Sequence, residues 1–199
     1  TQQKLSAQSG VINALAAYFM WGLAPIYFKL LADISADEIM IHRIVWSCLL
    51  LFIFILASKK LPALISILKQ PKVLVKLSIT ATFLAVNWFL FIWAVNNDHL
   101  LDASLGYFIN PLFSVALGVI FLGERLRKWQ VLAVVLAIVG VLIQLIYIGS
   151  LPIISLALAG TFGMYGLLRK KLPIDSFIGL LIESALMLPI AVIYWQFFL

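Results

Sequence analysis

Seven long apolar stretches, separated by short polar segments, make up most of this 199-residue chain. Each stretch is about 20 residues long, which is the length that an α-helix needs to cross the roughly 30 Å hydrocarbon core of a bilayer. A helix satisfies its own backbone hydrogen bonds in lipid, so we expect an all-α, polytopic membrane helix bundle. The seven predicted transmembrane helices span residues 10–31, 39–57, 73–95, 104–122, 129–148, 151–168 and 177–199.

Cations and acids occupy alternate loops of this pattern. Because multi-pass proteins retain Lys and Arg on the cytoplasmic side, the alternation predicts a cytoplasmic N-terminus. All Lys and Arg residues except Lys29 and Arg43 fall on that side. The cytoplasmic cations are Lys4, Lys59, Lys60, Lys69, Lys72, Lys76, Arg125, Arg127, Lys128, Arg169, Lys170 and Lys171, and the acids opposite are Asp33, Asp37, Glu38, Asp98 and Asp102.

The composition agrees with a membrane protein. The chain is 64% hydrophobic and 11% charged, whereas about a quarter of the residues of a soluble domain are charged. The net charge of +6 lies in short loops that face lipid headgroups, so we expect the lipid bilayer as a partner and no nucleic acid. The single cysteine, Cys48, excludes a disulfide framework and a thiol metal site, and we expect no metal and no cofactor.

A weak internal repeat predicts more helices than the seven found here. Trp21-Gly22-x-x-Pro25-x-x-x-Lys29 in the first helix aligns with Phe162-Gly163-x-x-Gly166-x-x-x-Lys170 in the sixth. The copies are five helices apart, so the second enters from the opposite face, as in inverted-repeat transporters. We therefore expect a ten-helix (5+5) protein in which 1–148 is the first repeat and 149–199 begins the second. The start at Thr1 and the end in an apolar run at Leu199 also predict a fragment.

Several motifs resemble a known family. The run Ile120-Phe-Leu-Gly-Glu124-Arg125-Leu126, followed by Trp129-Gln130, is similar to the end of the fourth helix in EamA-type members of the drug/metabolite transporter superfamily, as is Trp21-Gly22-x-x-Pro25 in the first helix. Other segments resemble the RarD branch: His42-Arg43-x-x-Trp46-Ser47, Asn87-Trp88-Phe-Leu-Phe-Ile-Trp93, and Gly106-Tyr107-Phe-Ile-Asn110-Pro111. The resemblance implies ten helices, both termini in the cytoplasm, a bacterial inner-membrane location and a central cavity, but no particular substrate.

Two predicted helices carry aromatic and polar side chains at helical spacing, so these side chains share one face. Pro25 and Pro111 each remove a backbone hydrogen bond and predict a kink. Kinked helices with polar faces are typical of a cavity wall, although the stripes also suit packing between helices. The stripes are Ala14, Tyr18, Trp21, Pro25 and Lys29 in the first helix, and Ala103, Tyr107, Asn110, Ser114 and Gly118 in the fourth.

Arg43, Asn87, Trp88 and Tyr165 complete the predicted substrate-binding residues. Asn87 is equally well interpreted as a hydrogen bond between two helices. Arg43 and Lys29 lie on the outer side, contrary to the rule that Lys and Arg stay on the cytoplasmic side, which indicates that each has a binding partner there. We expect Asp33, Asp37, Glu38 or an anionic solute to be this partner, and Lys29 can also snorkel to the headgroups.

Glu183 stands among apolar residues in the seventh helix, where a carboxylate costs on the order of 2 to 3 kcal/mol unless it is neutralised or faces a cavity. Glu183 and His42 are therefore the candidates for coupling transport to protons, and a structural role for Glu183 is the alternative. Glu124 and Arg125 follow Gly123 at a helix end, which favours a structural turn over a substrate contact.

The pattern favours a secondary transporter or facilitator for a small organic solute, working by alternating access, and no enzyme. There is no phosphate-binding glycine loop and no Ser, His and acid constellation. The alternatives are a membrane-embedded enzyme or assembly factor that uses Glu183 and His42, and a channel. The sequence leaves the oligomeric state open.

Overall fold

The computed structural model describes residues 2–31, 33–149 and 152–198, and in these residues the chain forms helices and no strands. The elements are α1 (Gln2–Leu30), α2 (Ala36–Ala57), α3 (Leu61–Leu68), α4 (Pro71–Asn96), α5 (Leu100–Leu122), α6 (Lys128–Ile148), α7 (Ile153–Lys170) and α8 (Ser176–Phe198). Seven of them match the seven predicted stretches. The all-α prediction is confirmed.

Helix α3 was not predicted, because residues 58–71 read as a Lys-rich loop. Pro62 lies in the first turn of α3 and Pro71 begins α4, and both positions suit proline because no backbone N–H is needed there. The buried Leu64 joins the apolar cluster of Ile55, Leu77 and Ile182. With eight residues, α3 is too short to cross a bilayer and lies along one end of the bundle.

Five of the described helices are long and apolar enough to cross a membrane: α2, α4, α5, α6 and α8. The apolar part of α1, Leu15–Leu30, is shorter than these spans. Helix α7 is the shortest of the predicted spans; it includes Ser155 and Thr161 and ends on Arg169 and Lys170. Length and composition therefore indicate a multi-pass membrane protein, and the count of seven spans stays a prediction.

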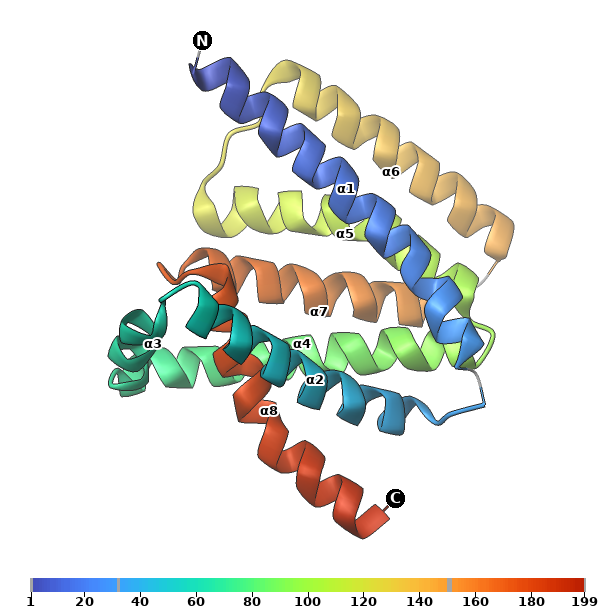
Figure 1. Cartoon of the computed structure of the whole chain (residues 1–199). Helices are drawn as coiled ribbons and strands as arrows, with labels where there is room; N and C mark the ends of the chain where they lie inside the picture. Colours follow the sequence, from blue (N-terminus) through green and yellow to red (C-terminus); the bar gives the residue numbers. More distant parts are fainter. Residues whose placement is uncertain (1, 32, 150–151, 199) are drawn as a thin grey trace.

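Helix α4 packs against α1, α2, α3, α5, α7 and α8, whereas α6 lies at the edge of the bundle (Figure 1). Half of the apolar span of α4 is buried, whereas none of the span of α6 is. The most extensive helix pairs are α5 with α7, α2 with α8, and α4 with α7. Helices α7 and α8 therefore pack directly against α2, α4 and α5, which precede them in the chain.

The loops rich in cations meet at one end of the bundle (Figure 1). There Lys60 donates to Asp175 at 2.6 Å, and Lys170 pairs with Glu124. The pair places Glu124 against the end of α7 in addition to the predicted turn. The turn itself is confirmed, since Gly123 ends α5 in the left-handed conformation with φ of 65°.

Lys29 forms an ion pair at the opposite end of the bundle, where its Nζ lies 2.6 Å from Asp98 Oδ1. The expected partners Asp33, Asp37 and Glu38 were wrong for Lys29. Asp98 lies in the turn between α4 and α5, near which α1 ends (Figure 1). This contact between distant segments was not visible in the sequence. Helices α1 and α5 continue through Pro25 and Pro111 as single helices.

Candidate functional site: an aromatic pocket beside Arg43

The two predicted stripes meet in space. Trp21 of α1 and Tyr107 of α5 have ring centroids 6.1 Å apart, and both rings contact Phe91 of α4, at 6.4 and 5.6 Å. A pocket of about 290 Å³ opens beside them. It is lined by Ala17, Tyr18, Trp21, Tyr107, Asn110 and Phe162. Pro25, one turn beyond Trp21, is half-buried and lines none of the pockets described here.

Asn87 joins two helices and also lines a cavity. Its Nδ2 donates to the carbonyl of Leu158 and to Thr161 Oγ1, each at 2.9 Å, so it joins α4 to α7. Asn87 also lines a small cavity together with Tyr107 and Asn110. Within the described part of the chain no donor reaches its Oδ1, which leaves this acceptor open to the cavity.

Arg43 lies beside the aromatic pocket and contacts two aromatic rings. Its guanidinium carbon stands 4.1 Å from the centroid of the buried Trp88 ring and 5.9 Å from that of Phe28. It lines a hollow of about 490 Å³ between the end of α1 and α2, together with Tyr27, Glu38, His42 and Trp46, among others. A second hollow of about 380 Å³ connects Arg43 to the side of Trp21.

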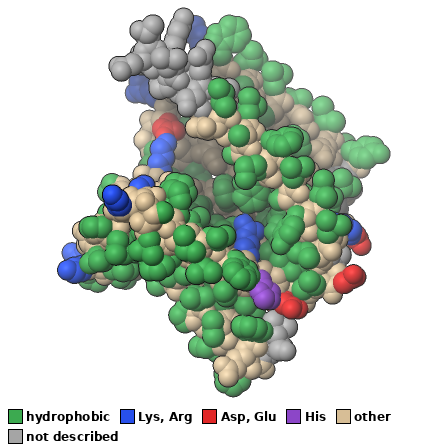
Figure 2. Space-filling view, in the orientation of Figure 1, with side chains coloured by type: hydrophobic (Ala, Val, Ile, Leu, Met, Phe, Trp, Pro, Cys, Tyr) green, Lys and Arg blue, Asp and Glu red, His purple; other side chains and the backbone are tan. Residues whose placement is uncertain are grey.

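Figure 2 shows the face that contains these openings. Hydrophobic side chains cover most of it, and the face is hollowed near its middle, where Lys or Arg atoms lie between green side chains. His42 is exposed, and its ring lies 6.1 Å from that of Trp195 in α8. The hollow is thus an apolar and aromatic space with very few charged groups.

Glu183 lies apart from these pockets in an enclosed polar cluster. Its carboxylate is fully buried, accepts hydrogen bonds from Thr80 Oγ1 at 2.6 Å and from Tyr165 OH at 3.1 Å, and lies 3.6 Å from Arg169 Nε. Tyr165 therefore belongs to this cluster. The sequence analysis did not predict Thr80 and Arg169 as members of this cluster, because it counted Arg169 among the loop cations. The available signal was the position of Arg169 in the last turn of α7, since the next helix carries the isolated carboxylate of Glu183.

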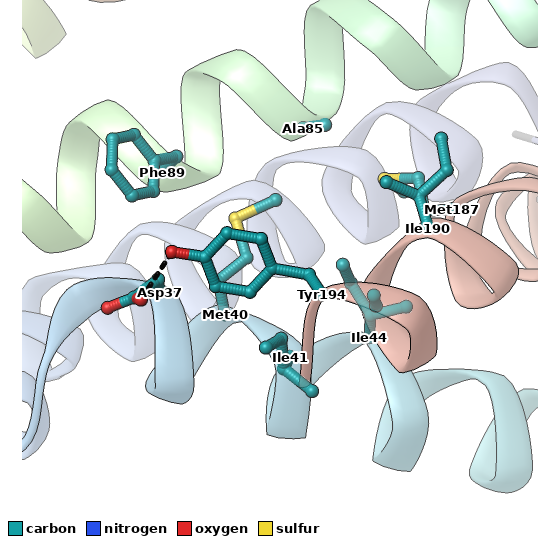
Figure 3. A pocket seen from close by; sticks show the side chains of 10 residues that line it. Asp37, Met40, Ile41, Ile44, Ala85, Phe89, Met187, Ile190 and Tyr194 are labelled. Carbon is teal, nitrogen blue, oxygen red and sulfur yellow. Dashed lines mark hydrogen bonds between the residues drawn. The ribbon is translucent and has the colours of Figure 1, made fainter. Parts of the chain in front are cut away.

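A further pocket, of about 400 Å³, lies between α2, α4 and α8. Figure 3 shows Met40, Ile41, Ile44 and Met187 around it, with Tyr194 reaching across to Asp37. The Tyr194 hydroxyl donates to Asp37 Oδ2 at 2.9 Å. None of the predicted site residues lines this pocket, and its walls are nearly all apolar.

No group of three or more His, Cys, Asp and Glu side chains gathers to hold a metal ion among residues 2–31, 33–149 and 152–198. The side chains at the aromatic pocket offer a ligand stacking against rings, hydrogen bonds to Asn110 and Tyr107, and one guanidinium nearby.

Comparison with known proteins assigns the chain to a family. The profile of the EamA-like transporter family matches residues 8–146. Protein RarD of Salmonella typhi is 52% identical over 187 residues, which are 94% of this chain and 64% of that protein. Protein RarD of Escherichia coli K12 is 51% identical, with 94% and 63% covered. A protein of Vibrio cholerae named as an uncharacterized transporter is 50% identical, with 98% and 64% covered.

The chain thus spans about two thirds of the length of these curated relatives. No solved structure matches it.

Proposed function

The chain belongs to the EamA-like transporter family, and from this premise we propose that the full protein moves a small organic solute across the bacterial cytoplasmic membrane by alternating access. The observation that carries the proposal is the pocket in which Trp21 and Tyr107 face each other from α1 and α5. A pocket of this kind, mostly apolar with a few convergent polar groups, is typical of small-molecule sites.

We further propose that the aromatic pocket and the Arg43 hollow form one solute path. Tyr18, Trp21, Tyr107 and Asn110 line the pocket, and Asn87 presents a free acceptor to the adjoining cavity. Trp21 and Arg43 line the hollow that connects the pocket to α2. These residues come from α1, α2, α4 and α5, so relative movement of the helices would change the site.

The proposed architecture is a ten-helix protein with two inverted repeats, divided here at 148/149, and with a cytoplasmic N-terminus. Support comes from the direction of the helices: α1 and α7, which carry the two copies of the weak repeat, run in opposite directions along the bundle (Figure 1). The short α3 leaves the alternation of directions intact, so the other helices from α1 to α8 would make the seven predicted crossings.

An enzyme or assembly factor that uses Glu183 and His42 is less well supported. Glu183 is held by Thr80, Tyr165 and Arg169, whereas His42 lies beside Trp195 and lines a hollow that Glu183 does not line. We keep both residues as candidates for proton coupling, each acting by itself.

Flux assays on the full-length protein in proteoliposomes test the proposed function. After a screen has identified a transported solute, Trp21→Ala, Tyr107→Ala and Asn110→Ala should each lower flux about tenfold or more, because each removes one or more contacts to the solute. Leu132→Ala in α6, whose side chain is 47% exposed and lies away from the pocket, is the matched control and should leave flux unchanged. Equal flux in all four variants would mean that the stripes are packing surfaces.

A further inference from the structure

Arg43 carries a positive charge about two turns into the apolar helix α2. An Arg near the centre of a transmembrane helix costs about 2.5 to 3.5 kcal/mol on insertion scales, so such residues face a cavity or a partner. In the described part of the chain, two other cations within helices have acidic partners: Lys29 pairs with Asp98, and Arg169 pairs with Glu183. Arg43 has no ion pair there.

The aromatic neighbours satisfy only one side of the guanidinium. Trp88 and Phe28 stabilise its face through cation–π contacts. The five N–H donors lie in the plane of the group and point away from a ring that covers its face. No described acceptor bonds them, although a guanidinium buried without acceptors is unfavourable.

These donors open into the hollow. The enclosed polar side-chain atoms that lack a partner in the described residues are Asn96 Oδ1, Arg169 Nη1 and Ser184 Oγ. The nitrogens of Arg43 are not among these enclosed atoms, and Arg43 lines both the space of about 490 Å³ between α1 and α2 and the hollow of about 380 Å³ beside Trp21. The site therefore offers an open donor fork between aromatic walls.

From this geometry we infer that Arg43 binds the carboxylate of the transported solute, and that the solute is a monocarboxylate with an apolar or aromatic body. The planar fork of Arg matches a carboxylate through two parallel hydrogen bonds. Trp21, Tyr27, Phe28 and Trp46 supply the walls for the apolar body. Glu38 lines the same hollow and disfavours a second negative charge on the solute.

This inference rests on the proposed function but is tested by binding alone. The purified full-length protein in detergent is titrated with phenylacetate, 3-phenylpropionate and indole-3-acetate, and with the carboxamide of each, while thermal stability and tryptophan fluorescence are followed. We expect at least one carboxylate to bind about tenfold more tightly than its carboxamide, because a charge-assisted bidentate pair is lost in the amide. Arg43→Gln should abolish this preference, and Arg43→Lys should retain only part of it.

Lys29→Gln is the matched control, because Lys29 is the other outer cation but pairs with Asp98; it should retain the preference. If no carboxylate binds, if acid and amide bind equally, or if Arg43→Gln keeps the preference, the inference fails. The comparison of acid with amide in the unmodified protein holds even if an Arg43 variant does not fold. Carboxylate binding without flux in proteoliposomes would refute the proposed function alone, and flux restricted to uncharged solutes would refute the carboxylate site alone.

Discussion

Arg43 and Glu183 are both ionisable side chains within apolar helices, yet their surroundings differ. Glu183 is fully buried, and Thr80, Tyr165 and Arg169 surround its carboxylate. Arg43 is half-buried, stacks on Trp88, and opens on a hollow. An enclosed and bonded charge stabilises one arrangement of helices, whereas an open charge without an acid partner is available to a ligand. The difference predicts opposite responses to mutation.

The largest effect is expected at Glu183. Glu183→Ala leaves the guanidinium of Arg169 buried without its carboxylate, and breaking a buried pair from one side destabilises by about 3 to 5 kcal/mol. The midpoint of thermal unfolding of the full-length protein in detergent should fall accordingly. The double variant Glu183→Ala with Arg169→Met removes both charges and should recover much of the loss. An unchanged midpoint in the single variant would contradict a stabilising role for Glu183 and so the predicted difference from Arg43.

Glu183→Gln separates the structural role from coupling. The amide keeps the size of the side chain and can still accept a hydrogen bond from Thr80. If Glu183 couples protons, flux should stop responding to the pH gradient. The enclosed geometry favours the other outcome, in which flux keeps its pH dependence and the unfolding midpoint alone decreases.

A smaller loss is expected at Gly179, where a Cβ would collide with the Arg169 guanidinium. Gly179→Ala should displace that group from Glu183 and destabilise the protein by about 1 to 3 kcal/mol, as overpacking does. Gly166→Ala in α7 is the matched control, because a Cβ there meets nothing within 4 Å. The control should unfold at the same temperature as the unmodified protein or slightly higher. Equal midpoints for both variants would show that Arg169 is not held in place.

Arg43 should respond in the opposite direction. Arg43→Met replaces a charge that has no acidic partner among the described residues by an apolar side chain of similar length, which in a partly buried site is neutral or stabilises by about 1 kcal/mol. Thermal unfolding in the absence of solute measures this change. A clear decrease in the midpoint would mean that Arg43 has a structural partner, and would remove the contrast with Glu183.

The smallest effect is expected at the exposed pair of Lys29 and Asp98. The hydrogen bond and the positive charge from Lys29 lower the pKa of Asp98 below its ordinary value of 3.8. The ionised carboxylate therefore stabilises the folded state above that pH, and the contribution is lost as the pH falls through the lowered pKa. Asp98→Asn should unfold slightly earlier than the unmodified protein at pH 7, and the two midpoints should converge well below pH 3.8. A difference that persists in acid would contradict the ion pair as its cause.

The helices were predictable because each property that defines them is local. Predicted ends such as Ala57 and Leu122 coincide with those of α2 and α5. The family was also predicted correctly, from the run around Glu124. Helix α3 was missed, because a short amphipathic helix between two Lys-rich segments has neither the length nor the composition of a span.

The pairing of charges could not be predicted from one sequence. Lys29 with Asp98 and Glu183 with Arg169 join segments far apart in the chain, and periodicity gives only the face of each helix. The sequence predicted the helix faces that carry Trp21 and Tyr107, but the contact between the two rings depends on how α1 crosses α4 and α5. Whether these residues bind a solute stays a prediction.

The seam between α5 and α7 has a consequence for how the protein can move. The two helices run in the same direction, a Cβ at Gly106 would lie 3.2 Å from Leu158 Cβ and from the Ser155 carbonyl, and Ser155 Oγ donates to the Asp102 carbonyl at 2.6 Å. Such close backbone contact resists sliding and separation. One helix of this pair precedes the 148/149 boundary and the other follows it. If the protein works by the proposed rocking motion, α5 and α7 would move as one rigid body, and the hinge would then not coincide with the proposed repeat boundary at 148/149.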